Sequence, residues 1–253
     1  MRDGVASETA RRVAAQRLTF PRALTDYGDP QADERLTRDV AAGTRTRTNL
    51  LTRHLEGRTM FFDRVVVGAL ERGVTQIVIA AAGYDGRAWR YAKPGVRFFE
   101  LDHPSTQADK VARVERLGLA TDRIAFVPAD FAVADVGAAL RAAALDPTKA
   151  TVFTLEGIAI YLDRPVLTSV LHGMASVATA DSRVAISLSI NGRGLSSSVA
   201  FRHAVARLGE PVRTVLAPEE VDDFLAASGW ERTDAGSERA RAGGLVVLRP
   251  LLR

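Results

Sequence analysis

Short apolar segments alternate with helix-forming segments over residues 75–190, and this alternation constrains the fold more than any other feature. Strands are expected at 75–81, 96–102, 123–131, 150–157 and 182–190, and helices at 86–92, 105–118, 133–144 and 163–178. Such a strand–helix succession predicts a parallel sheet with helices on both faces. We therefore predict an α/β, Rossmann-like fold with a seven-stranded, mostly parallel sheet.

The segments outside this alternation predict further parts of the same single domain. In chain order, the parts are an N-terminal helical cap (1–58), a core that binds the ligand (59–190), a lid inserted after strand five (191–216), and a C-terminal helix with strands (217–253). The cap begins with an amphipathic helix over 5–18 and continues as a looser stretch over 19–45. A helix is expected over 59–72 and another over 218–231, and the last strand over 243–250.

Composition excludes several classes of function. The chain has 253 residues, 47% of them hydrophobic, and no cysteine, so it can bury a large core but forms neither disulfides nor thiolate metal sites. Its histidines show no metal-ligand spacing, and no metal is expected. The net charge of +4 comes from dispersed arginines, which argues against a nucleic acid partner. No segment is long and apolar enough to span a membrane or serve as an export signal, which favours a cytoplasmic protein.

Four successive strands of the predicted sheet finish in a glycine or an acid. These residues are Gly83, Glu100 with Asp102, Asp130, and Glu156. Ligands of open α/β sheets bind outside the carboxyl ends of the strands. Any one acid has a simpler explanation, because acids favour the helix N-termini that such loops lead into. Their gathering at one edge favours a nucleoside-like ligand.

The turn after the first strand narrows the class of ligand. In "AAAGYDG", Ala81 and Asp85 stand where a dinucleotide-binding turn would have glycines, so close approach of a pyrophosphate is poorly supported. An adenosine without phosphates fits better, and S-adenosylmethionine is such a ligand. Asp102 would hold its ribose, Asp130 its adenine amino group, and Phe131 would pack on the adenine ring.

Five motifs occur in a fixed order: "RTMFFDRVV", "AAAGYDGRAWR", "FFELDHP", "PADF" and "LEGIAIYL". Together they resemble the leucine carboxyl methyltransferase-type family of class I S-adenosylmethionine-dependent methyltransferases, including bacterial O-methyltransferases of the tetracenomycin-pathway type. The resemblance covers residues 58–190 and, more weakly, 215–250. It implies that Arg58 pairs with the methionine carboxylate, Gly83 lies beneath the cofactor, and Glu156 lies near the ammonium group. Glu100 is implied beside the ribose, and Ala81 replaces a glycine more usual in the family.

The resemblance implies methyl transfer to a carboxylate or hydroxyl of a small molecule, in bacterial specialised metabolism of the polyketide type. A carboxylate acceptor needs no base, whereas a phenol or alcohol does. The preferred base is His203 in the expected lid, ahead of His172 and His103. Tyr161 either lines the acceptor pocket or belongs to the core.

Alternatives remain open at this level. Three arginines form either a basic mouth for an anionic acceptor or a solvated helix face: Arg45, Arg47 and Arg53. The same cofactor site also suits a non-methylating cyclase or a regulator. A nucleic-acid-binding protein built on the same sheet is a third hypothesis. A homodimer is compatible with the sequence but not indicated by it.

Overall fold

Seven strands form one mixed sheet in the computed structural model, which describes residues 8–43, 50–193, 211–234 and 244–251. The strands are β1 (Gln76–Ala80), β2 (Arg97–Asp102), β3 (Ile124–Pro128), β4 (Thr151–Leu155), β5 (Arg183–Ser187), β6 (Trp230–Arg232) and β7 (Leu245–Pro250). Their order is β3-β2-β1-β4-β5-β7-β6; β1 to β5 are parallel, whereas β7 pairs antiparallel with β5 and with β6. The predicted seven-stranded, mostly parallel sheet is confirmed.

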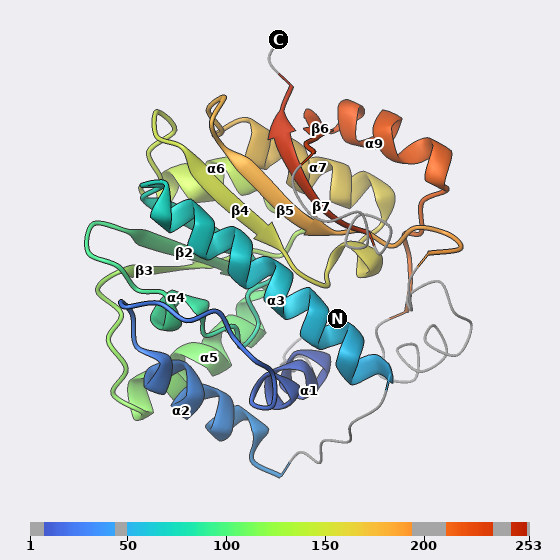
Figure 1. The fold of residues 1–253 in the computed structure, drawn as a ribbon. Coiled ribbons are helices and arrows are strands. Elements are labelled where there is room, and N and C mark those ends of the chain that lie inside the picture. The colour runs from blue at the N-terminus through green and yellow to red at the C-terminus, as the bar shows by residue number, and fades with distance from the viewer. Residues whose placement is uncertain (1–7, 44–49, 194–210, 235–243, 252–253) are drawn as a thin grey trace.

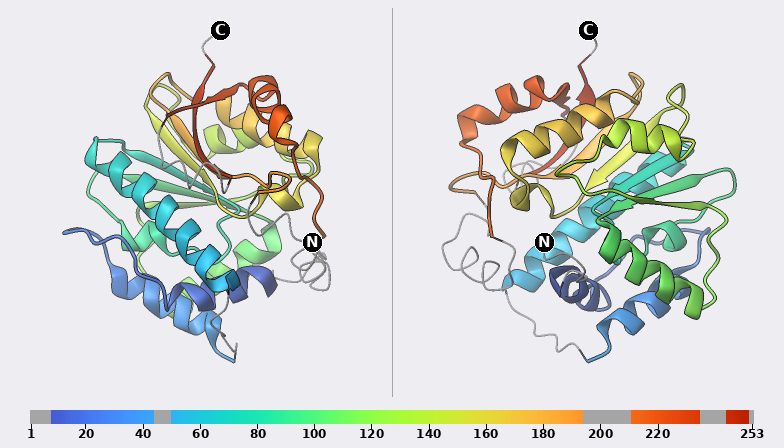
Figure 2. Two further views of the ribbon diagram at one scale, coloured as in Figure 1. Left: turned by 45° about the vertical axis from the view of Figure 1, so that its right-hand side comes forward. Right: turned by 180° about the vertical axis from the view of Figure 1, so that it is seen from behind.

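Helices cover both faces of this sheet. They are α1 (Glu8–Arg17), α2 (Pro30–Ala41), α3 (Leu50–Glu71), α4 (Arg87–Arg90), α5 (Pro104–Arg116), α6 (Val136–Ala142), α7 (Arg164–Ala175) and α9 (Val221–Ala227), with short 3-10 helices η1 (Ala159–Tyr161) and η3 (Pro218–Glu220). Figures 1 and 2 show α3 crossing one face, while α6, α7 and α9 lie over the other. None of the described helices is both long and apolar enough to cross a bilayer.

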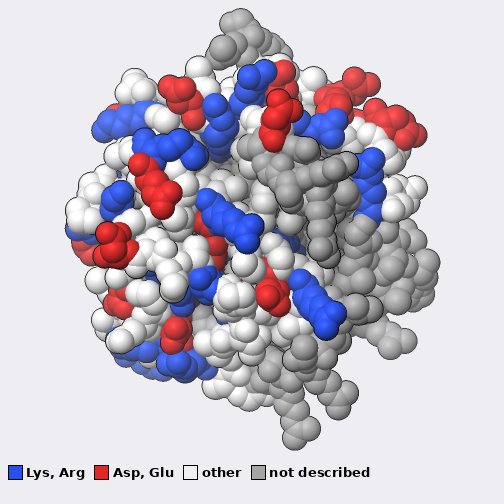
Figure 3. All heavy atoms as spheres, in the orientation of Figure 1, with Lys and Arg blue, Asp and Glu red and all other residues white. Residues whose placement is uncertain are grey.

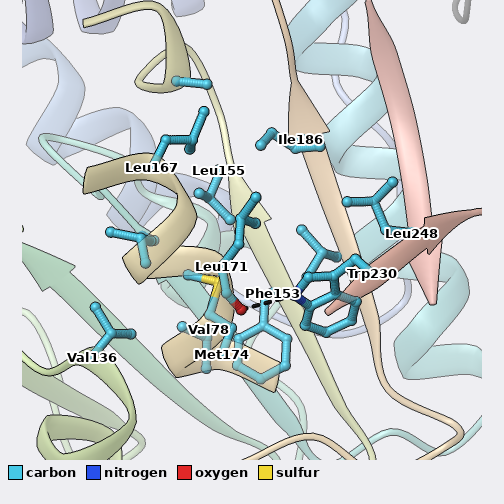
Figure 4. Close-up of a cluster of buried hydrophobic side chains, with 14 of the residues drawn as sticks. Val78, Val136, Phe153, Leu155, Leu167, Leu171, Met174, Ile186, Trp230 and Leu248 are labelled. Carbon is cyan, nitrogen blue, oxygen red and sulfur yellow. Dashed lines mark hydrogen bonds between the residues drawn. The ribbon is translucent and has the colours of Figure 1, made fainter. Parts of the chain in front are cut away.

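The strand alternation divides the core between these two faces. Val78 and Ala80 of β1 pack toward α6, α7 and α9, whereas Ile77 and Ile79 pack toward α2, α3 and α4. Trp230 is fully buried on the first side, and its Nε1 donates to the Leu171 carbonyl at 2.8 Å (Figure 4). Because this bond satisfies the indole N–H, burial of the large aromatic ring leaves no unpaired donor on the indole.

Three elements differ clearly from the sequence prediction. The helix expected over 59–72 is α3, which begins at Leu50, within the predicted cap. The stretch 19–45, predicted as loose, contains α2, whose N-cap Asp29 accepts the N–H of Ala32 at 2.9 Å. The sequence Gly-Asp-Pro favours a turn, but Asp followed by Pro is also a helix start, with Pro30 at the first position. The helix expected over 218–231 ends at Ala227, and Trp230 begins β6 instead.

The chain turns at the strand ends where a ligand is expected. The strand order reverses between β1 and β4, so the loops after these two strands flank a topological switch point. Most of the predicted lid, residues 194–210, lies outside the described residues. On the face seen in Figure 3, acidic and basic side chains are interspersed over the described surface.

Candidate functional site

The carboxyl ends of β1 and β2 meet at the predicted glycine and acid. The N–H of Gly83 donates to Asp102 Oδ2 over 2.5 Å, and the N–H of His103 donates to Oδ1 over 2.7 Å. Burial raises the pKa of the Asp102 carboxyl, although both N–H donors oppose the shift. A carboxylate offers about four acceptor positions. These two bonds therefore leave Asp102 able to accept from a further hydroxyl.

The backbone between β1 and this contact adopts left-handed conformations. Ala81 has φ 54° and Gly83 has φ 49°. A Cβ placed on Gly83 would lie 3.2 Å from the Cβ of Ala10 in α1. The segment that approaches Gly83 so closely in the structure is therefore helix α1, and the N-terminal cap forms part of the site.

Asp130 and Phe131 follow β3, as predicted, but each already has protein contacts. The Asp130 carboxylate accepts the N–H of Ala132 at 3.0 Å. Phe131 is 9% exposed and belongs to the core cluster on the α6–α7 face. Little of Phe131 is thus available to a ligand, whereas Asp130 is half-buried and keeps acceptor capacity.

Glu156, directly after β4, is surrounded by three arginines. Arg87 Nη1 lies 2.7 Å from Oε2, Arg17 Nη2 lies 3.2 Å from the same oxygen, and Arg58 Nε lies 3.2 Å from Oε1. Burial by itself would raise the pKa of this carboxyl, but the charges of Arg87, Arg17 and Arg58 hold it well below its usual range. Glu156 is therefore ionised, and its charge is already balanced by protein cations.

Gly157 makes room for Arg58. It has φ 75°, and a Cβ at this position would lie 2.8 Å from Arg58 Nη1. The guanidinium therefore lies against a bare backbone, with its Nε directed to Glu156. The Arg58 side chain is 14% exposed. The sequence predicted Arg58 and Glu156 as separate contacts to a ligand, and the structure brings them together.

Arg87 was not identified from the sequence, although it lies at the centre of the buried charges. It is fully buried; its Nε donates to Asp63 Oδ1 at 2.7 Å and its Nη2 to the Thr59 carbonyl at 3.0 Å. Its Nη1 also contacts Asp85 at 2.5 Å. Asp63 interrupts the apolar run "MFF" and "VVV" in α3, and an acid on an apolar helix face was the available signal for a buried partner.

Glu100 lies on β2, two residues before Asp102, and its carboxylate is paired inside the protein. It is fully buried, and its Oε2 accepts from Lys110 Nζ of α5 at 2.6 Å. Lys110 also donates to the Asp85 carbonyl at 2.7 Å. Burial raises the pKa of the Glu100 carboxyl to about 7, against the opposing charge of Lys110. Glu100 and Asp102 lie two positions apart on β2, so their side chains are on the same face of the strand. The predicted contact of Glu100 with a ribose would have to form beside its buried ion pair with Lys110.

The candidate catalytic residues are only partly described. Tyr161 lies half-buried in η1, where the Ile160 carbonyl accepts the N–H of Arg213 at 2.8 Å. His203, Arg45 and Arg47 lie outside the described residues. The other candidates, His103, His172 and Arg53, lie among the described residues. His103 caps α5 by accepting the Ser105 N–H, His172 is exposed on α7, and Arg53 is exposed on α3. In the described part of the chain, no group of three His, Asp or Glu side chains is placed to hold a metal ion.

Two solved structures share the fold over nearly the whole chain. A DUF574 family protein from Streptomyces avermitilis superposes with a TM-score of 0.62 at 18% identity, covering 98% of this chain and 99% of that one. A candidate methyltransferase from Thermobifida fusca gives 0.60 at 16% identity, covering 98% and 96%. At such low sequence identity, these two structures support the fold assignment alone.

Curated relatives carry the name S-adenosyl-L-methionine-dependent methyltransferase, assigned to them provisionally. A protein of Frankia alni is 34% identical over 200 residues, covering 76% of this chain and 67% of its own length. One from Mycobacterium avium is 34% identical over 148 residues, so the chain spans about half of that relative, 47%.

A sequence model described as leucine carboxyl methyltransferase matches residues 2–175. The match includes the N-terminal helices, which precede the residue 58 at which the resemblance was predicted to begin, and it stops before the predicted weaker region at 215–250. The chain therefore belongs to the leucine carboxyl methyltransferase family.

Proposed function

We propose that this chain is an S-adenosylmethionine-dependent O-methyltransferase that methylates a carboxylate or hydroxyl group of a small molecule. The observation that carries the proposal is the arrangement at the topological switch point. Gly83 and Asp102 lie in contact on the β1–β2 side, and Arg58 and Glu156 lie in contact on the β4 side. A ligand between them would meet a carboxylate at one end and a guanidinium at the other, which suits a ribose and an amino-acid carboxylate.

The residues present fit this cofactor with one change of role. Asp102 has capacity for the ribose hydroxyls and Asp130 for the adenine amino group, and the small exposed part of Phe131 would pack on the adenine ring. Arg58, held over Gly157, would pair with the methionine carboxylate. Glu156 is already balanced by three arginines, so we assign it to orienting Arg58.

The bound cofactor supplies a methyl group already activated as a sulfonium. The protein's task is then to orient both reactants and exclude water. Helix α1 contributes by covering the Gly83 turn through Ala10. A carboxylate acceptor is anionic and needs no general base, and the family name supports this acceptor over a hydroxyl. For a hydroxyl acceptor, His203 and Tyr161 stay the candidate groups.

The first test is binding of S-adenosylhomocysteine, measured by calorimetry. Asp102→Asn and Arg58→Gln should each weaken binding by tenfold or more, because each removes a charge-assisted contact to the ligand, about 1.5–3 kcal/mol. Arg53→Gln, the same change on the exposed side of α3, should bind as the wild type does. Unchanged affinity in both site variants would exclude this cofactor site.

The second test is transfer of labelled methyl from S-adenosylmethionine to a panel of small organic acids and phenols. Labelled ester or ether would support methyl transfer, and polyketide-type acids are the acceptors we expect. Cofactor binding without transfer to any class of acceptor would instead favour a cyclase or a regulator. Size-exclusion chromatography at assay concentration determines whether the chain forms a homodimer.

A further inference from the structure

One hydrogen bond to the described residues holds the guanidinium of Arg58. Its Nε donates to Glu156 Oε1 at 3.2 Å, while Nη1 and Nη2 have no hydrogen-bond partner in the described part of the chain. Gly157, which lies against this guanidinium, has no side chain to fix it. In the proposed function, the two terminal nitrogens are the ones that bind the cofactor carboxylate. The direction in which they point therefore depends on how Glu156 is held.

Arg87 holds the other oxygen of Glu156. Its Nη1 donates to Glu156 Oε2 at 2.7 Å, whereas Arg17 Nη2 lies 3.2 Å from the same oxygen. Because Arg87 is fully buried, water competes little for this bond. With Oε2 bound to Arg87, Oε1 is the oxygen that meets Arg58. The three side chains thus form a chain of contacts from Arg87 through Glu156 to Arg58.

Arg87 is also bound to the helix that carries Arg58. Its Nε donates to Asp63 Oδ1 at 2.7 Å and its Nη2 to the Thr59 carbonyl at 3.0 Å, and both partners belong to α3. Thr59 follows Arg58 directly, so Arg87 fixes the backbone beside Arg58 as well as the carboxylate that contacts its side chain. Only the planar fork of an arginine reaches these groups at once, because lysine offers a single nitrogen.

We propose that Arg87 is a positioning residue for cofactor binding: it holds Glu156 and α3 so that Nη1 and Nη2 of Arg58 face the carboxylate of the cofactor's amino-acid group. This inference rests on the proposed function and adds to it a residue that acts through Arg58. Arg87 itself is fully buried, so it does not touch the ligand.

The adenosine half of the site does not depend on the Arg87 side chain. Asp85, in the turn after β1, accepts the backbone N–H of Arg87 at 2.8 Å, and the Asp85 carbonyl accepts from Lys110 Nζ at 2.7 Å. Both bonds remain when another side chain replaces that of Arg87. Asp102 is held by two backbone N–H groups. A substitution of Arg87 should therefore affect a ligand that has the amino-acid group and spare one that lacks it.

Calorimetry with two ligands tests this role: S-adenosylhomocysteine, and methylthioadenosine, which has the same adenosine and sulfur but no amino-acid group. Arg87→Lys keeps the charge and loses the fork, so S-adenosylhomocysteine should bind about tenfold more weakly and methylthioadenosine within about twofold of wild type. Arg90→Lys is the matched control, because Arg90 is also a buried arginine of α4 but pairs with Asp33. It should leave both affinities unchanged. Equal weakening of both ligands in Arg87→Lys, or wild-type affinity for S-adenosylhomocysteine, would overturn the proposal.

A double-mutant cycle determines whether Arg87 acts through Arg58. In the Arg58→Gln background, Arg87→Lys should change the affinity for S-adenosylhomocysteine by less than about twofold, because the guanidinium that it orients is gone. A further loss of about tenfold in the double variant would contradict the contact chain and assign Arg87 a general structural role.

Asp63→Asn gives a second test that keeps Arg87 and decides the question if Arg87→Lys does not fold. The amide retains an oxygen for Arg87 Nε but removes the charge that fixes it. Binding of S-adenosylhomocysteine should weaken by about threefold while methylthioadenosine binds as before, and equal effects on the two ligands would refute the inference. A wild-type protein that binds neither ligand would instead refute the proposed function itself.

Discussion

At the scale of single residues, the turn after β1 contains backbone strain. Ala81 has φ 54°, a left-handed conformation that costs a residue with a Cβ roughly 1–2 kcal/mol. Ala81→Gly relieves this cost and loses roughly 0.5–1 kcal/mol through the greater freedom of glycine in the unfolded chain. We expect the free energy of unfolding, measured in urea, to rise by up to about 1.5 kcal/mol.

Ala82 provides the matched control for this substitution. It lies in the same turn, is 4% exposed and is not among the residues with positive φ in the described chain. Ala82→Gly should therefore lower the free energy of unfolding, because it adds backbone freedom and removes a buried methyl. Equal losses in the two variants would show that Ala81 is unstrained.

The sequence predicted the residues of the site better than their partners. Gly83, Asp102 and Glu156 were predictable because parallel strands bring their carboxyl ends to one edge. The burial of Glu100 and the pairing of Glu156 with three arginines were not predictable from the sequence. Those contacts join residues far apart in the chain, such as Arg58 and Glu156, 98 positions apart, and they depend on how the helices pack on the sheet.

At the scale of elements, the placement of α1 against Gly83 can be separated from backbone strain. Gly83→Ala introduces a Cβ at φ 49° and 3.2 Å from Ala10. Gly73→Ala also introduces a Cβ at positive φ, 84°, but with open space around it. Both variants should lose roughly 1–2 kcal/mol of stability through the backbone. Only Gly83→Ala should also speed amide hydrogen exchange in α1, because the added methyl displaces that helix.

Equal exchange rates in α1 for Gly83→Ala and Gly73→Ala would contradict the contact between Ala10 and Gly83. The amphipathic pattern of 5–18 predicted that a helix forms, and α1 confirms it. Amphipathicity does not tell which surface a helix covers, so the contact of α1 with the site was not predictable from this pattern. The start of α2 was not predictable either, because an Asp-Pro sequence is typical both of a helix start and of a turn.

At the scale of the whole molecule, Glu100 makes stability depend on pH. Its pKa is raised from 4.5 to about 7 by burial in the folded chain, so between these values the folded state holds more protons than the unfolded state. The free energy of unfolding should therefore fall as pH rises from about 4.5 to 7, by on the order of 3 kcal/mol from this group.

Urea unfolding at intervals across this pH range measures the effect. Glu100→Gln should remove the downward slope, since the amide does not titrate and can still accept from Lys110. Glu115→Gln, at an exposed position of α5, should retain it. A slope that persists in Glu100→Gln would assign the pH dependence to another group.

Arg17 reaches two places in the structure. Its Nη2 lies 3.2 Å from Glu156 and 3.3 Å from Asp85, while the residue also lines a cavity beside α2. A guanidinium shared in this way couples the two places: a change that moves the Arg17 side chain at the cavity also alters the charge balance at Glu156, and the coupling has the same free energy in the other direction. The end of α1 is thus the position through which a change in the N-terminal helices would reach the carboxyl end of β4.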